Sequence, residues 1–215
     1  MPACGRTQCG GSVWNAGRKE VKNLRTFVAV DVSDAVRRYA EALKDELTAC
    51  LSGIHWTRRE NLHLTLKFLG DVPETELAGV CGAVQAAVCQ QDPLEIECGG
   101  LGAFPDHQRP RTLWVGIRHG EEPLRTLQGL IDERLTEFGF PPERRRFHGH
   151  LTIGRIRRRD GLAADQLAEV KGIIEREQAA EGVMMVVEEV ITFSSFLDPE
   201  GRVYQPIARA RLGTS

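Results

Sequence analysis

Two short segments of the chain share one pattern, a histidine and a threonine that alternate with apolar residues. The first is His63-Leu64-Thr65-Leu66 and the second is His150-Leu151-Thr152-Ile153. With six histidines among 215 residues, this pattern is expected by chance only about 0.06 times. The repeat therefore indicates a functional pair rather than a coincidence.

Each copy lies in a strand-like run, and this predicts where its polar side chains point. Successive side chains of a strand project to opposite faces, so His63 and Thr65 share one face about 7 Å apart, and His150 and Thr152 do the same. With an ordinary pKa near ~6.5, one imidazole can be neutral while the other is protonated. A neutral histidine can deprotonate a water, a protonated one can protonate a leaving oxygen, and hydroxyls can donate to phosphoryl oxygens. These residue types suit metal-independent cleavage of a phosphodiester.

Arginines flank the second copy on both sides. Guanidinium groups match phosphate oxygens, although a basic run is as often a solvated surface. We single out Arg155, which ends the motif strand, and expect it to reach a phosphate held by His150 and Thr152. The run consists of Arg144, Arg145, Arg146, Arg155, Arg157, Arg158 and Arg159.

Aromatic residues could stack an RNA base beside such a site. Core packing is the commoner role for each of the candidates, which are Phe27, Trp56, Phe104 and Phe147.

A metal site is the main alternative for the second copy, because His148 and His150 form a His-x-His pair. A zinc site needs further His, Cys, Asp or Glu ligands, and none follows at a useful spacing. We therefore expect no metal and no other cofactor, and a structural role for His148. The cysteines lack a Cys-x-x-Cys pair and an export signal, so we expect reduced thiols at Cys4, Cys9, Cys50, Cys81, Cys89 and Cys98.

Composition limits the class of protein. The formal net charge of -2 gives no global sign of a nucleic-acid-binding protein, so any basic surface must be local. No apolar run is long enough for a transmembrane helix, and residues 1–22 lack the apolar segment of a secretory signal. We expect residues 1–22 to be a disordered tail, and the protein to be cytoplasmic, monomeric and not bound to a membrane.

Periodicity predicts strands and helices in mixed order. Residues 62–69 alternate strictly, which places His63, Thr65 and Lys67 on one face and Phe68 with the leucines on the other. Gly70 to Pro73 is expected to end this strand, and Gly99, Gly100 and Gly102 to form a turn. We expect strands at 26–30, 62–69, 94–98, 112–117, 147–155, 183–193 and 203–212, and helices at 34–51, 74–89, 124–138 and 163–178.

The order of these elements is not the regular strand–helix alternation of a parallel doubly wound fold. It predicts an α+β fold of mainly antiparallel sheet with outer helices. We expect residues 23–212 to form a single bilobal domain. Two pseudo-symmetric lobes would each offer one His-x-Thr strand to a central groove.

The segments around the two motifs resemble a known family. The runs 61–70 (NLHLTLKFLG) and 147–155 (FHGHLTIGR) look like the signature motifs of the two-histidine phosphoesterases. The chain is most similar to their LigT-like RNA 2′,3′-cyclic phosphodiesterases, historically called 2′-5′ RNA ligases. The resemblance extends from Asn23 to Leu212.

That resemblance implies hydrolysis of the 2′,3′-cyclic phosphate ends of RNA to 2′-phosphomonoesters. It also implies that His63 is the proton donor and His150 the proton acceptor, an order that the nearly symmetric repeat does not itself reveal. Thr65, Thr152 and Arg155 would bind the substrate. The alternatives are 2′-5′ RNA ligation, cleavage of another cyclic nucleotide, and a non-catalytic module that binds nucleotides or RNA.

Overall fold

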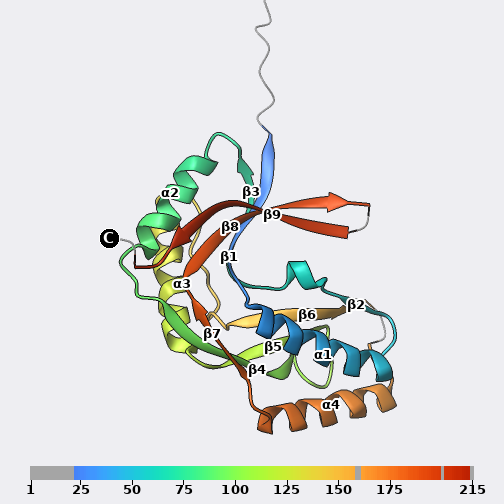
Figure 1. The fold of residues 1–215 in the computed structure, drawn as a ribbon. Helices are drawn as coiled ribbons and strands as arrows, with labels where there is room; N and C mark the ends of the chain where they lie inside the picture. Colours follow the sequence, from blue (N-terminus) through green and yellow to red (C-terminus); the bar gives the residue numbers. More distant parts are fainter. Residues whose placement is uncertain (1–21, 158–160, 200, 214–215) are drawn as a thin grey trace, which may run out of the picture.

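The computed structural model describes residues 22–157, 161–199 and 201–213 (Figure 1). The expected tail over 1–22, except Lys22, lies outside this part, as do Cys4 and Cys9. No helix in the described part is long and apolar enough to cross a membrane.

The strands are β1 (Asn23–Asp31), β2 (Ile54–Trp56), β3 (His63–Pro73), β4 (Leu94–Phe104), β5 (Thr112–His119), β6 (His150–Ile156), β7 (Val183–Val187), β8 (Glu189–Asp198) and β9 (Gly201–Arg211). The helices are α1 (Asp34–Cys50), α2 (Leu77–Val88), α3 (Glu121–Thr136) and α4 (Ala164–Ala179), and a 3-10 turn covers Arg59–Asn61.

The strands form one curled antiparallel sheet in the order β7-β4-β5-β6-β3-β1-β8-β9, with β2 paired to β6. The first lobe contains β1, β3, β8 and β9, and the second contains β2 and β4 to β7. Between the lobes, β3 and β6 pair through a single register position, Leu64 opposite Leu151. The expected α+β fold of two antiparallel lobes is confirmed, and each lobe contributes one motif strand to the centre.

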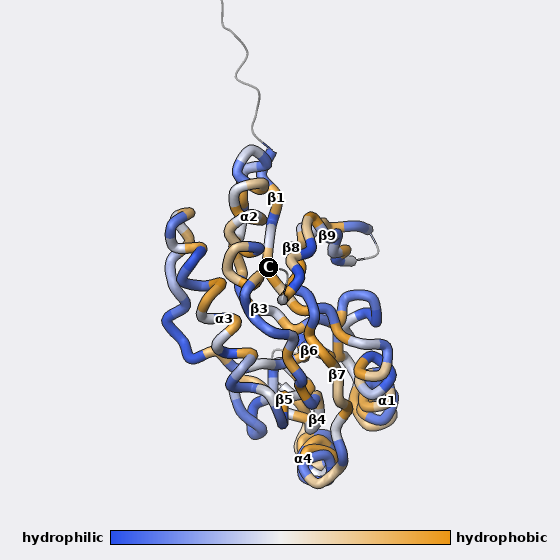
Figure 2. The backbone as a smooth tube through the Cα atoms, turned by 60° about the vertical axis from the view of Figure 1, so that its left-hand side comes forward, coloured by the Kyte–Doolittle hydropathy of each residue, from blue (hydrophilic) through white to orange (hydrophobic). Residues whose placement is uncertain are grey.

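The helices cover the outside of this sheet. Helices α1 and α4 pack against the second lobe, whereas α2 and α3 pack against each other, with α2 on β8 and β9 and α3 on β3 and β4 (Figure 1). Figure 2 shows apolar segments along the strands and alternating polar and apolar segments along the helices. Helix α1 illustrates the cause, since Ser33 Oγ accepts from Val36 N (3.3 Å) and the buried residues Val36, Ala40, Leu43 and Leu47 recur at helical spacing.

Strand β3 does not end at Gly70, so the expected break over residues 70–73 is wrong. The strand stays paired with β1 as far as Pro73, which lies opposite Asn23. Gly70 has a φ of +73°, a conformation that glycine adopts without steric cost. It therefore forms an irregularity within the ladder instead of a turn after it.

Two register shifts between β1 and β3 change which side chains of β3 face the groove. Each extra residue of a β-bulge reverses the alternation beyond it. Lys67 is consequently buried (2% exposed) and Phe68 is 68% exposed, the reverse of the expected order. His63 and Thr65 precede the bulges and keep their shared face.

The glycine-rich segment is also not the expected turn, because β4 continues through it to Phe104. A Cβ at Gly102 would lie 2.2 Å from Cη2 of Trp114 on β5. The absence of a side chain therefore makes room for the indole ring. Of the other expected elements, the strand at 183–193 divides into β7 and β8, and the helix expected from residue 74 begins at Leu77.

The ammonium group of buried Lys67 predicts a large effect on stability. It pairs with the Asp132 carboxylate of α3 and donates to the Pro141 carbonyl (2.9 Å). Removing one partner leaves an uncompensated buried charge, so Lys67→Met should lower the free energy of unfolding by about 3 kcal/mol. Urea denaturation measures this. The exposed Lys171→Met is the control, and an equal effect of both substitutions would contradict the prediction.

Candidate active site

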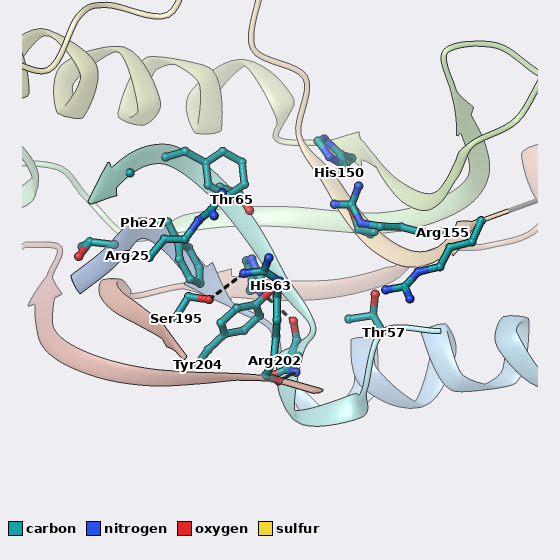
Figure 3. Close-up of a pocket in the computed structure, with 16 residues that line it drawn as sticks. Arg25, Phe27, Thr57, His63, Thr65, His150, Arg155, Ser195, Arg202 and Tyr204 are labelled. Atoms are coloured by element: carbon teal, nitrogen blue, oxygen red, sulfur yellow. Dashed lines mark hydrogen bonds between the residues drawn. The ribbon is translucent and has the colours of Figure 1, made fainter. Parts of the chain in front are cut away.

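The two motif strands are neighbours, so their polar side chains converge on one cavity. Because Leu64 pairs with Leu151 in antiparallel register, His63 comes opposite Thr152 and Thr65 comes opposite His150. All four side chains and Arg155 line a cavity of about 510 Å³, which we term the motif cavity (Figure 3). The structure thus brings together all five residues singled out in the sequence.

Both imidazole rings are fixed in the same way. His63 Nδ1 lies 2.7 Å from the Asn61 carbonyl oxygen, and His150 Nδ1 lies 2.8 Å from the His148 carbonyl oxygen. A carbonyl oxygen only accepts, so each Nδ1 bears the donated hydrogen. In the neutral ring Nε2 is then the unprotonated nitrogen, able to accept or, once protonated, to deliver a proton.

The residues that supply these carbonyls are themselves anchored by their side chains. The Asn61 amide donates to the Arg202 carbonyl (2.8 Å), and His148 Nδ1 is 3.0 Å from Glu121 Oε1. His148 therefore supports His150, the structural role expected for it. Among the described residues, no group of three or more His, Cys, Asp or Glu side chains is arranged to hold a metal ion.

Aromatic rings enclose the two histidines. Ring centroids of Phe27 and Tyr204 lie 4.9 and 5.2 Å from that of His63. Those of Phe104 and Trp114 lie 5.0 and 6.2 Å from that of His150. Burial among these rings lowers the pKa of both histidines below the ordinary value, because it disfavours the charged imidazolium.

Charged neighbours act on the two rings in opposite directions. Burial has the largest effect on the pKa of His63 and lowers it. The hydrogen bond to the Asn61 carbonyl and the carboxylate of Asp31 both raise this pKa. For His150 the charges of His148 and Arg155 add to burial and lower the pKa further, against the hydrogen bond to the His148 carbonyl. Protonation of His150 also lowers the pKa of His63. Protonation of one ring therefore disfavours protonation of the other.

The arginine run divides between two cavities. Arg155 and Arg157 line the motif cavity, whereas Arg145 and Arg146 line a second one of about 720 Å³, the flanking cavity. Arg158 and Arg159 lie outside the described residues. Arg25 of β1 and Arg202 of β9 line the motif cavity as well.

The aromatic candidates have different positions. Phe27 lines the motif cavity, and Phe104 and Phe147 line the flanking cavity. Trp56 packs against the core instead, over Gly154. Sequence reasoning missed Tyr204, Ser195 and Arg202, which the β8–β9 hairpin places beside His63 (Figure 3). No pattern in the sequence of this hairpin marks them.

Comparison with known proteins gives one consistent family. The model described as LigT-like phosphoesterase matches residues 30–114 and again residues 115–204. The RNA 2′,3′-cyclic phosphodiesterase of Archaeoglobus fulgidus is 34% identical over 86% of this chain and 98% of its own. The enzyme of the same name from Methanothermobacter thermautotrophicus is 33% identical over 88% of this chain and 99% of its own.

Solved structures show the same fold. A protein of Thermus thermophilus superimposes with a TM-score of 0.71, at 23% identity, over 88% of this chain and 98% of its own. Escherichia coli LigT in complex with 3′-AMP superimposes with a TM-score of 0.68, at 20% identity, over 89% of this chain and 99% of its own. The match extends over both lobes.

The opposite charged neighbours predict opposite titration shifts in two variants. Asp31→Asn removes a negative charge that favours the imidazolium, so it should lower the pKa of His63. Arg155→Gln removes a positive charge and should raise the pKa of His150. NMR titration of the imidazole resonances measures both values. The resonances of the exposed His107 are the control within each variant, and a shift of the opposite sign would contradict this electrostatic explanation.

Proposed function

This chain belongs to the LigT-like phosphoesterase family, and we propose that it hydrolyses the 2′,3′-cyclic phosphate ends of RNA to 2′-phosphomonoesters. Three relatives that bear this activity in their names match over 98 to 100% of their own length. The observation that supports the proposal most is the pair His63 and His150, which line one cavity with each Nδ1 fixed by a carbonyl. The enzyme is a phosphodiesterase.

In the proposed reaction, water attacks phosphorus and O3′ leaves. His150 Nε2 takes a proton from the water as the new P–O bond forms. The P–O3′ bond breaks, and protonated His63 gives its proton to O3′, which yields a 3′-hydroxyl and a 2′-phosphate. The products leave His63 neutral and His150 protonated, so a proton exchange with solvent restores the starting state.

The charged neighbours support this order of acid and base. The acid must be protonated before reaction, and Asp31 stabilises the protonated form of His63. The base must be neutral, and Arg155 together with His148 disfavours the protonated form of His150. The reverse order would require each ring to hold the protonation state that its charged neighbours Asp31, His148 and Arg155 disfavour.

The remaining polar groups would bind the substrate. Thr65 and Thr152 alternate with the two histidines across the strands, where their hydroxyls can donate to the two non-bridging oxygens. Arg155 adds a guanidinium group on the same cavity wall. Because O3′ belongs to the terminal ribose, that nucleoside would lie on the His63 side of the motif cavity, beside Tyr204.

The protein as a whole is proposed to be one domain. Helix α1 follows β1 of the first lobe yet packs on the second, and α3 reaches β3 of the first lobe. The helices of each lobe thus contact the other lobe, so we infer that residues 23–212 fold as a unit. We also propose that this unit acts as a cytoplasmic monomer. The scheme uses no metal or other cofactor, so hydrolysis should persist in the presence of EDTA.

Substitution of either histidine should slow hydrolysis by orders of magnitude. His63→Ala and His150→Ala each remove one proton transfer, and each should lower kcat by roughly 10²- to 10⁴-fold. Product release from a 2′,3′-cyclic dinucleotide, separated by chromatography into 2′- and 3′-phosphates, measures this and should show the 2′ isomer alone. The exposed His55→Ala is the matched control. Full activity in either variant, with an unchanged circular dichroism spectrum, would contradict the proposed acid–base mechanism.

The pH profile distinguishes the acid from the base. Activity falls as pH rises through the pKa of the acid and falls as pH drops through the pKa of the base. Asp31→Asn should therefore move the alkaline limb of kcat/KM to lower pH, since it lowers the pKa of His63. Arg155→Gln should move the acid limb to higher pH. If Asp31→Asn moves the acid limb instead, the two roles are exchanged.

A further inference from the structure

The carbonyl that holds the proposed base lies in an irregular segment. His150 Nδ1 donates to the carbonyl oxygen of His148 (2.8 Å), and residues 141–148 belong to no helix or strand. Within the described part of the chain, none of these residues forms a backbone–backbone hydrogen bond. The matching carbonyl of the acid lies in a 3-10 turn instead, where Asn61 N donates to the Arg58 carbonyl (2.9 Å). The base therefore depends on side chains to keep its carbonyl in place.

The side chain of His148 connects this carbonyl to helix α3. His148 Nδ1 lies 3.0 Å from Oε1 of Glu121, in the first turn of the helix. Oε2 of the same carboxylate lies 4.0 Å from Nη2 of Arg125, one turn further along. The Glu121 side chain is only 30% exposed, so water screens these contacts less than those of a surface ion pair. Arg125 thus helps to keep Glu121 in place, and Glu121 holds the imidazole of His148.

The same helix holds the other end of the segment. Oδ2 of Asp132 accepts from Glu143 N (3.0 Å). The Lys67 ammonium pairs with this carboxylate and also donates to the Pro141 carbonyl (2.9 Å). The irregular segment is therefore held between two carboxylates of α3, and Glu121 is the one next to the base.

Packing alone does not keep the ring of His148 in one orientation. Its side chain is 46% exposed at the wall of the flanking cavity. The ring meets that of Trp114 at an angle of 76°, with centroids 5.0 Å apart. Holding a half-exposed side chain in one rotamer costs conformational entropy, so a specific bond is needed to offset that cost, and Glu121 supplies it.

We propose that Glu121 is a positioning residue for the base and acts through His148. This rests on the proposed function, in which His150 Nε2 takes the proton from water. That nitrogen is free only while the ring hydrogen is on Nδ1, and the His148 carbonyl keeps it there. A ring that loses this acceptor can carry its hydrogen on Nε2, where it blocks the base. Glu121 therefore fixes the tautomer of His150.

The first experiment separates catalysis from binding. Glu121→Ala should lower kcat for a 2′,3′-cyclic dinucleotide by about 10- to 100-fold, because a displaced base transfers the proton poorly. KM should change little, since Glu121 is not among the residues that line the motif cavity. Glu122→Ala removes the neighbouring carboxylate, which is 74% exposed and pairs with Arg125, and as the matched control it should retain full kcat. Circular dichroism checks that each variant is folded.

Nitrogen NMR of the imidazole rings reports the tautomer itself. Neutral His150 should carry its hydrogen on Nδ1 in the wild-type protein and partly on Nε2 in Glu121→Ala. The tautomer of His63 should not change, because the carbonyl that holds it belongs to Asn61. Glu121→Gln still accepts from His148 Nδ1, so this variant should keep the wild-type tautomer and most of kcat.

Three results would overturn the proposal. Full kcat in Glu121→Ala would show that the His148 carbonyl stays in place without Glu121. A lower kcat with an unchanged tautomer would show that Glu121 affects the reaction by another route. An equal loss in Glu121→Gln and Glu121→Ala would show that the charge acts and not the hydrogen bond. Failure of the proposed function is distinct, because the wild-type protein would then hydrolyse no cyclic dinucleotide, whereas the tautomer is measured without substrate.

Discussion

The active site depends on one register position between two strands. Leu64 and Leu151 are both fully buried and are paired where β3 meets β6. A shift by one residue would turn the side chains of a strand to its other face. The leucines would then face the groove, and the imidazoles and hydroxyls would enter the core. Burial of the apolar residues of each motif therefore fixes the direction of its polar residues.

The same packing that fixes the rings also sets their protonation. Aromatic neighbours lower the pKa of His63 and His150, while the carbonyls of Asn61 and His148 hold each Nδ1 hydrogen. A phosphodiester anion placed between the rings would favour an imidazolium against that burial, because opposite charges attract strongly away from water. Burial thus favours neutral rings, and the substrate anion itself would help to supply the charged acid.

Strand periodicity was sufficient to predict the catalytic face of β3, because His63 and Thr65 both precede the first bulge. It failed from Lys67 onward, since an extra residue in a ladder leaves no mark in a sequence that still alternates. Gly102 of β4 was misread for a related reason, because the Trp114 ring that occupies its side-chain space comes from another strand. The residues of the β8–β9 hairpin were unpredictable, since only tertiary pairing brings Tyr204 to His63.

Asymmetry around a symmetric pair gives the reaction its direction. The two motifs are nearly identical, and each histidine is bound to the carbonyl two residues before it. What differs is the surroundings, namely a hairpin with Tyr204 and Arg202 beside His63, and helix α3 with residues 143–148 beside His150. Asp31 and Arg155 extend this difference to charge. A duplicated catalytic element can therefore acquire distinct acid and base roles without any change within the motifs, because the neighbouring strands decide which ring keeps the proton.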